Sequence, residues 1–147
     1  MKKLVIVCMA LCLMFSGCKY DEGPFITIRE AETRLVGVWE LVNVYKNGEK
    51  ITTTDISANR PGTYYYIYFD YILSVTAIVN GNVRSSNQGF WRFENNEKEL
   101  VIQFQLPGEY YNYKAEIKKL TMSELRYEYT DEDGNTWRFE MYSRSHT

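Results

Sequence analysis

Apolar and polar residues alternate along most of the chain from Gly37 onward, which is the pattern of strands with one buried face. β-Branched and aromatic residues are enriched in these segments. Asn-Gly or Asp-Gly pairs, which suit tight hairpin turns, separate several of them at positions 47–48, 80–81 and 133–134. The pattern predicts eight strands: Val38–Tyr45, Thr63–Phe69, Ile72–Val79, Gln88–Phe93, Leu100–Gln105, Tyr110–Lys119, Leu125–Tyr129 and Thr136–Ser143.

The short connections between these strands favour antiparallel neighbours. An open sheet of eight strands would leave two unpaired edges, and closing the sheet removes both. We therefore predict an all-β fold, an eight-stranded antiparallel up-and-down barrel, with a short helical turn at Ala31–Val36 before it. The longest connection, Glu49–Arg60, is rich in small polar residues and is expected to form a flap over one mouth.

The same alternation predicts which side chains face the barrel interior. It is cleanest in the last four strands, where charged residues occupy the opposite face. The predicted inward residues are Trp39, Leu41, Tyr45, Trp91, Phe93, Leu100, Ile102, Phe104, Tyr111, Tyr113, Ala115, Ile117, Leu125, Tyr127, Tyr129, Trp137, Phe139 and Met141.

The second predicted strand is bulky on both faces, so its register is open to two readings. We place Tyr65, Ile67 and Phe69 inside the barrel. This choice leaves Tyr64, Tyr66 and Tyr68 as an outward row of aromatic rings.

The N-terminus has a different pattern, with two lysines followed by an uncharged apolar run over Leu4–Phe15. These 12 residues are too few for a spanning helix, which needs about 20, although a retained membrane anchor is the alternative reading. Small residues and Cys18 follow, as at the end of a secretory signal. The run from Leu13 to Cys18 resembles a bacterial lipobox. That resemblance implies a signal peptide over residues 1–17 and attachment of lipid to Cys18.

Residues 18–30 are predicted to form a lipidated linker before the barrel domain at 31–147, because Lys19–Pro24 is polar and ends in a Gly-Pro turn. Its acidic residues resemble the export signals of surface lipoproteins in Bacteroidota. The resemblance implies an outer-membrane lipoprotein of the cell envelope and favours the cell surface over the periplasm. The alternative is an ordinary solvated linker that faces the periplasm.

The cysteine and charge content exclude some kinds of chemistry and argue against some classes of partner. Cys8 and Cys12 lie in the apolar run and would leave with it, so the mature domain has no disulfide and no thiolate chemistry. The full chain carries 17 basic and 19 acidic residues, and the loss of Lys2 and Lys3 makes the mature chain more acidic. This balance argues against nucleic acid or anionic lipid as a partner.

Candidate catalytic and metal-binding residues are sparse. The single histidine, His146, lies one residue from the end of the chain, where termini are usually frayed. The densest acidic cluster, Asp131–Asp133, precedes a glycine and reads as a hairpin turn rather than a calcium loop. The chain has no glycine-rich phosphate-binding motif. We therefore expect neither an enzyme nor a cofactor or metal site.

Three short motifs resemble those of lipocalin-like lipoproteins of Bacteroidota: Gly37-Val38-Trp39, the run Gly89–Phe93 and Leu125-Arg126-Tyr127. The resemblance covers nearly all of the mature chain and implies a barrel that holds a ligand. It also implies an arginine from a late strand, Arg126 or Arg138, packed against Trp39. The alternation turns both arginines outward, so either the register or this part of the resemblance is wrong.

Aromatic residues make up 16% of the chain, and many of them serve a packed core. The leading hypothesis is a small apolar or amphipathic ligand inside the barrel, which needs a cavity of about 300 Å³ or more. Its lining would come from Trp39, Tyr65, Trp91, Tyr113, Tyr127 and Trp137. The alternative is a surface interaction module in which Tyr64, Tyr66 and Tyr68 meet a glycan or a protein partner.

Overall fold

The computed structural model describes residues 19–23, 29–51, 60–79 and 81–145. Within them the chain forms one short helix, α2 (Ala31–Leu35), and strands that match the eight predicted segments, plus one short extra strand. The strands are β1 (Gly37–Lys46), β2 (Glu49–Lys50), β3 (Tyr64–Ile67), β4 (Ile72–Val79), β5 (Asn82–Glu94), β6 (Glu99–Leu106), β7 (Glu109–Leu120), β8 (Glu124–Thr130) and β9 (Thr136–Ser143).

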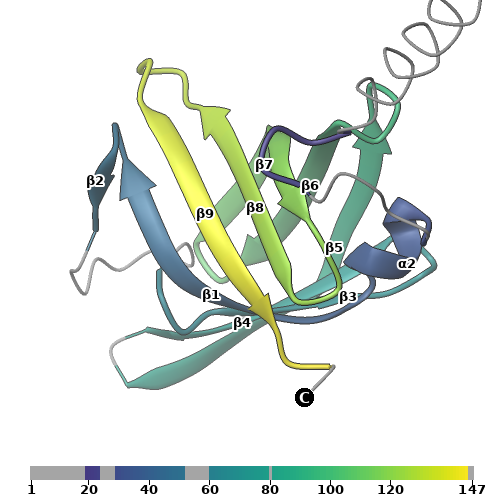
Figure 1. Cartoon of the computed structure of the whole chain (residues 1–147). Coiled ribbons are helices and arrows are strands. Elements are labelled where there is room, and N and C mark those ends of the chain that lie inside the picture. Colours follow the sequence, from purple (N-terminus) through teal and green to yellow (C-terminus); the bar gives the residue numbers. More distant parts are fainter. Residues whose placement is uncertain (1–18, 24–28, 52–59, 80, 146–147) are drawn as a thin grey trace, which may run out of the picture.

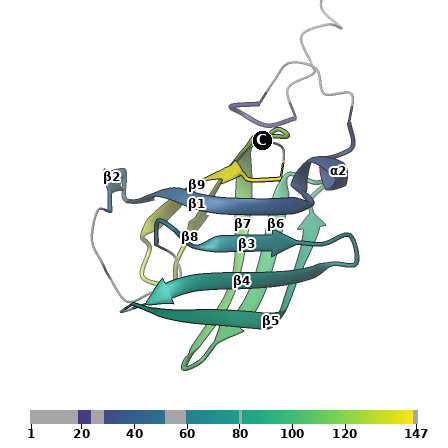
Figure 2. The same ribbon diagram turned by 90° about the horizontal axis from the view of Figure 1, so that it is seen from below.

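The sheet closes on itself through β1, which pairs with β3 along one edge and with β9 along the other. Every neighbouring pair is antiparallel, and the remaining strands follow one another in chain order. Figure 1 shows the resulting barrel, with β2 forming a short antiparallel hairpin with the end of β1. In Figure 2, β1, β3, β4 and β5 form one wall and β6 to β9 cross behind it. The predicted closed antiparallel barrel is therefore confirmed.

Side chains from all eight barrel strands fill the interior. Most of the predicted inward residues are almost fully buried, and β6 to β9 follow the predicted alternation closely. Phe93, Tyr111, Tyr129 and Trp137 are partly buried and pack against this core. The fully buried side chains with the largest volumes are Trp39, Tyr65, Tyr127, Phe104 and Phe139.

The prediction for Tyr45 is wrong because β1 contains a bulge. The pairing between β1 and β9 shifts register between Leu41 and Asn43, so the inward set changes phase at this point. Val44 becomes fully buried in place of Tyr45, which is only half-buried. An extra residue in one strand flips every later side chain to the opposite face.

The prediction for Phe69 is also wrong, because β3 ends at Ile67 and the chain turns before Phe69. Tyr65 and Ile67 are buried as predicted, whereas the side chain of Phe69 is 62% exposed. The turn is fixed by a hydrogen bond from the Tyr68 amide to the Ile72 carbonyl, 3.0 Å. Alternation no longer decides the direction of a side chain once the strand has ended.

Strand β5 begins six residues before the predicted start at Gln88. Its first half pairs with β4 and its second half with β6, and the register shifts between Leu73 and Val75 of β4. Gly89 lies at this change of partner, where a Cβ atom would stand 2.6 Å from the Leu73 carbonyl oxygen. Only glycine fits so close a backbone approach, which explains the glycine that opens the Gly89–Phe93 motif.

One end of the barrel, called the closed end below, is covered by α2 (Figure 1). Leu35 is fully buried there, and its carbonyl accepts a hydrogen bond from the Trp39 indole nitrogen at 2.7 Å. Arg34 is also buried, and it donates to the Leu120 carbonyl at 2.5 Å. The short helix predicted before the first strand is thus the cap of this end.

Residues 19–23 pack against the closed end, which differs from the solvated linker that their polarity predicts. Tyr20 is 3% exposed and belongs to the core cluster, with the Arg34 guanidinium 5.6 Å from its ring centroid. Lys19 forms an ion pair with Glu97. Asp21 pairs with Lys118 at 3.3 Å, and the Glu22 amide donates to the Lys118 carbonyl at 2.8 Å.

Arg126 and Arg138 lie on the outer face of the barrel, as the alternation predicts. Both donate to the same Glu22 carboxylate oxygen, each at 2.9 Å. Burial alone would raise the pKa of Glu22, but the hydrogen bonds from the two arginines outweigh it and hold that pKa below its usual value. The register is therefore right, and the late-strand arginine against Trp39 that the lipocalin resemblance implies is not supplied by these two residues.

Candidate functional site

A cluster of tyrosine side chains lies in the interior of the barrel, and the end of the barrel opposite α2 is called the open end below. The hydroxyls of Tyr113 and Tyr127 lie 3.0 Å apart, and Tyr65 also hydrogen-bonds with Tyr113. Burial raises the pKa of all three well above the usual value for tyrosine. The cluster therefore stays neutral and offers hydroxyl donors and acceptors inside an apolar barrel.

Aromatic rings continue from this cluster to the rim of the open end in a nearly parallel stack. Tyr129 stacks on Tyr113 with ring centroids 4.6 Å apart, and it is parallel to Phe139 within 2°. Trp137 lies beyond Phe139 at 6.5 Å and is half-buried. The Lys46 ammonium stands 5.1 Å from the Trp137 ring, within cation–π range. The outer rings of this stack are thus reachable from solvent.

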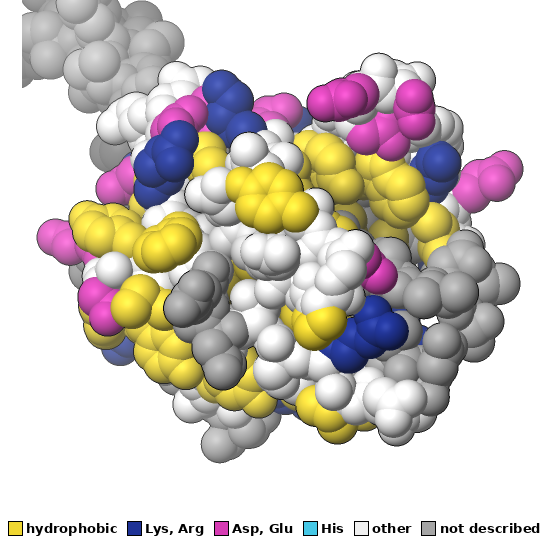
Figure 3. Space-filling view, turned by 180° about the vertical axis from the view of Figure 1, so that it is seen from behind, with side chains coloured by type: hydrophobic (Ala, Val, Ile, Leu, Met, Phe, Trp, Pro, Cys, Tyr) yellow, Lys and Arg dark blue, Asp and Glu magenta, His cyan; other side chains and the backbone are white. Residues whose placement is uncertain are grey.

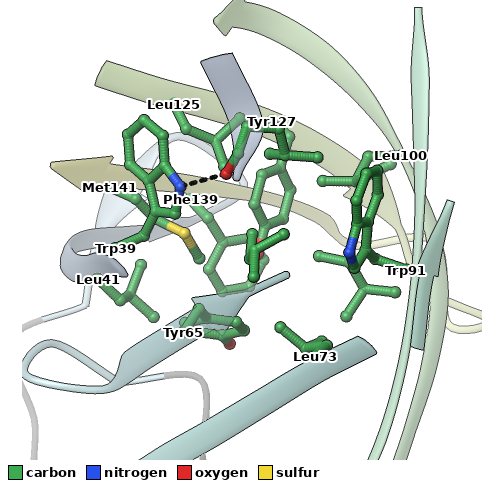
Figure 4. Close-up of a cluster of buried hydrophobic side chains, with 14 of the residues drawn as sticks. Trp39, Leu41, Tyr65, Leu73, Trp91, Leu100, Leu125, Tyr127, Phe139 and Met141 are labelled. Carbon is green, nitrogen blue, oxygen red and sulfur yellow. Dashed lines mark hydrogen bonds between the residues drawn. The ribbon is translucent and has the colours of Figure 1, made fainter. Parts of the chain in front are cut away.

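Five of the six predicted ligand residues are buried inside the barrel, and Trp137 is half-buried at the rim. Figure 4 shows Trp39 and Trp91 on opposite sides of the interior cluster, with Tyr127 and Phe139 between them. Each of the two indole nitrogens donates to a backbone carbonyl, Trp39 to Leu35 and Trp91 to Tyr68. These bonds explain both tryptophans as structural anchors, whereas the tyrosines gather toward the open end.

A hollow of about 400 Å³ opens beside the stack, where β7 and β8 part. The two strands pair from Glu116 and Glu128 toward the closed end, and the hollow lies on the other side of this pair. Ala115 and Tyr129 form its inner side. Its outer side is polar and includes Glu99, Lys114, Glu116, Glu128 and Thr136. A hollow of this size suits a small ligand.

The alternation in the sequence placed Tyr129 inside the barrel, but not the contacts that make it a candidate ligand residue. Burial, together with the nearby Asp131 carboxylate, raises the pKa of Tyr129 to about 12. Asp131, predicted to belong to a turn, does lie in one and accepts a hydrogen bond from the Trp137 indole at 2.8 Å. An acid six residues before a tryptophan across a hairpin turn is the only sequence signal for this contact.

The raised pKa of Tyr129 gives a testable prediction in alkaline titration. The folded state keeps the proton from pH 10 to about 12, whereas the unfolded state loses it near 10.0. The stability contributed by this group is therefore complete below pH 10 and is lost as the pH rises toward 12. In Tyr129→Phe, the tyrosinate absorbance of the folded protein should lack one group that titrates near 12. Tyr110→Phe, an exposed control, should keep that group.

The predicted outward row of tyrosines is not evenly exposed. Tyr68 is 48% exposed but lies beyond the end of β3, while Tyr64 and Tyr66 are half-buried within the strand. Tyr64 and Tyr66 thus follow the alternation, whereas Tyr68 lies outside the strand. A glycan or protein partner for this surface stays a prediction.

The described part of the chain has two further hollows on its surface. A hollow of about 320 Å³ lies on the outer face of β5 and β6 and includes Tyr71, Phe90 and Gln103. Another of about 370 Å³ lies beside Tyr45 and Arg138. The described residues contain no group of three His, Cys, Asp or Glu side chains placed to hold a metal ion. They also contain no helix long and apolar enough to cross a membrane.

Comparisons with known proteins identify the fold alone. No family model and no curated protein matches the chain. Among solved structures, it is similar to a redesigned β-barrel, with a TM-score of 0.52 and 12% sequence identity. That match covers 82% of this chain and all of the other one. The chain is thus a β-barrel, and its function has to be argued from its own residues.

Proposed function

We propose that this protein is a lipid-anchored binding protein of a bacterial cell envelope and that its barrel binds a small amphipathic ligand at the open end. The apolar run and Cys18 at the N-terminus support the anchor and an outer-membrane location. The observation that carries the ligand proposal is the hollow between β7 and β8, which reaches the side of the aromatic stack.

The two sides of this hollow suit the two parts of an amphipathic molecule. The half-buried ring of Tyr129 offers an apolar inner side. Three glutamates face this side, and Lys114 is already paired with Glu99 at 3.5 Å and with Glu94 at 3.7 Å. Glu116 is likewise paired with Lys118 at 2.8 Å, and Glu128 with Arg138 at 3.3 Å. The carboxylate oxygens can still accept further hydrogen bonds, so the ligand's polar part is expected to carry hydroxyl or amino groups that donate to them rather than an anion.

A fluorescence titration with the neutral apolar probe N-phenyl-1-naphthylamine tests the binding proposal. We expect the full-length protein to bind the probe and Tyr129→Ala to bind it about tenfold more weakly, because one stacking face is lost. Tyr110→Ala is the matched control, since Tyr110 is 61% exposed on the outside of the same barrel. Its affinity should not change.

A second variant separates binding from folding. The Lys114 side chain is 54% exposed and lines the hollow without supporting the core, so Lys114→Glu should fold normally. We expect it to bind an amine-bearing amphiphile such as dodecylamine more tightly than the unaltered protein does. If neither probe binds, or if both variants bind as the unaltered protein does, the open end is not the ligand site.

A further inference from the structure

A patch of exposed apolar side chains surrounds the turn between β3 and β4. Its members lie in that turn, at the start of β4, or opposite that start on β5, where Phe90 pairs with Ile72. They are Tyr68, Phe69, Tyr71, Ile72 and Phe90, with exposed fractions between 37% and 62%. We call this set the turn patch. Figure 3 shows hydrophobic side chains on the left-hand side of the face it presents, and others over its upper part. Contiguous exposed apolar surface of this kind marks an interaction site more often than a single exposed residue does.

The turn patch is held rigidly by the tryptophan beneath it. The Trp91 indole donates to the Tyr68 carbonyl at 2.9 Å, and the Trp91 amide donates to the Tyr71 carbonyl at 3.0 Å. Tyr71 has a φ of +63°, which side chains other than glycine rarely adopt, and its ring lies 5.4 Å from the indole. Backbone strain that presents an aromatic ring to solvent points to a use for that ring.

The described N-terminus lies at the same end of the barrel as the turn patch, because the end of β3 pairs with the start of β1 directly after α2. Lys19 is ion-paired with Glu97 in the turn after β5, and the neighbouring Tyr20 is buried. Phe90 lies on β5 four residues before its end at Glu94, a rise of about 13 Å along the strand. Cys18 is bonded directly to Lys19, so the Cα atoms of the two residues are about 3.8 Å apart. A lipid on Cys18 would thus hold the closed end of the barrel, with the turn patch on its rim, close to the bilayer.

We propose that the turn patch rests on the surface of the membrane that holds the Cys18 lipid, which makes it a second contact beside the anchor. The inference rests on the proposed lipid anchor. Tyrosine and phenylalanine favour the boundary between lipid and water. The short tether keeps the patch at high effective concentration beside the bilayer, so a weak contact is sufficient. Stable membrane attachment commonly combines two such signals.

The charges around the turn patch suit an uncharged or zwitterionic surface. Arg92, which points outward next to Phe90 on β5, is paired with Glu94 at 2.7 Å. Asp70 is exposed within the turn itself and adds a negative charge. The patch therefore offers apolar contact without a cationic cluster among the described residues, and an anionic lipid is not favoured. Phosphatidylcholine is accordingly the lipid chosen for the test.

Site-directed spin labelling of the lipidated protein tests this arrangement. The mature chain has no cysteine besides Cys18, whose sulfur the lipid blocks, so one introduced cysteine takes the label alone. Phe90→Cys reports on the turn patch, and Val83→Cys is the control, because Val83 is 69% exposed near the opposite end of β5. In phosphatidylcholine vesicles, the label at position 90 should be severalfold more accessible to oxygen than to a water-soluble nickel chelate. The label at position 83 should show the reverse.

The possible failures of this experiment can be told apart. The mass of the same sample shows whether Cys18 carries lipid. If the lipid is present and the label at position 90 collides freely with the nickel chelate, the membrane contact is wrong and the anchor stands. If neither reagent reaches position 90, the label packs against this protein or a second copy of it instead, which also overturns the inference. If Cys18 carries no lipid, both the anchor and the contact that depends on it are refuted.

Discussion

Replacement of Trp39 by alanine is expected to remove most of the stability of the barrel. Trp39 is 1% exposed and is the largest fully buried side chain. Its loss leaves a cavity at the closed end, and such truncations cost about 3–5 kcal/mol. It also leaves the buried Leu35 carbonyl without its indole donor, which adds about 1–3 kcal/mol. Because domains are stable by only about 5–15 kcal/mol, Trp39→Ala should unfold near room temperature in a thermal melt followed by circular dichroism.

Two further variants separate the cavity from the hydrogen bond. Trp39→Phe keeps most of the ring but loses the donor to Leu35, so its melting temperature should lie between those of the unaltered protein and Trp39→Ala. Trp137→Ala removes a tryptophan that is only half-buried at the open end and should cost much less. Equal losses in Trp39→Ala and Trp137→Ala would show that the closed end does not hold the barrel together.

The strands of the second half of the barrel were predictable because each has one strongly charged face. In β7, Lys114 and Glu116 alternate with Ala115 and Ile117, and the structure exposes the first pair and buries the second. Glycine in a hairpin turn adds a second, independent signal, since Gly134 adopts a φ of +83° between β8 and β9. Where period and turn chemistry agree, local sequence is sufficient to set the register.

The wrong predictions of side-chain direction and strand bounds occur where pairing with a neighbouring strand, rather than the local sequence, decides the backbone geometry. The bulge in β1 is defined by its pairing with β9, and nothing around Asn43 announces it. The first half of β5 is polar and lacks alternation, yet it pairs with β4, and the Ser86 carbonyl accepts a hydrogen bond from the Ser74 hydroxyl at 2.6 Å. Backbone pairing can form a strand in a segment with low strand propensity, so composition alone missed it.

The docked segment at residues 19–23 was hidden for a related reason. The partners of Asp21 and Glu22 lie 97 to 116 residues away, on β7 to β9. Charged residues beside a glycine resemble any solvated linker until the fold brings those basic side chains to them. Tyr20 was the one residue in the segment that indicated docking, because a tyrosine side chain gains stability when it packs against a hydrophobic surface.

For the candidate site, the sequence predicted which tyrosines lie inside the barrel but not where a hollow opens beside them. Alternation placed Tyr65, Tyr113 and Tyr127 inside the barrel, and they do meet there through their hydroxyls. The hollow at Tyr129 depends on where the pairing of β7 and β8 ends, at Glu116 and Glu128. The spacing of residues in the sequence does not show where this pairing ends. The hollow beside Tyr129 could therefore be found only in the structure.

Replacement of Cys18 by serine is expected to abolish membrane attachment. Serine keeps the size and polarity of the side chain but has no thiol to carry the lipid. Without the acyl chains, the fraction of protein that sediments with membranes should fall more than about tenfold, since each buried CH₂ group contributes about 0.8 kcal/mol. Fractionation of the host cells, followed by intact-mass measurement of the chain, measures both the attachment and the lipid.

Cys12→Ser is the matched control, because Cys12 lies in the apolar run that precedes the expected cleavage site and leaves with it. This variant should be lipidated and should sediment as the unaltered protein does. The barrel should melt at the same temperature in Cys18→Ser, because the docked segment begins after Cys18 and the mature domain holds no disulfide. If the unaltered chain recovered from membranes carries no lipid mass on Cys18, or begins elsewhere than residue 18, the anchor is not a lipid on Cys18. The orientation proposed for the turn patch then fails with it.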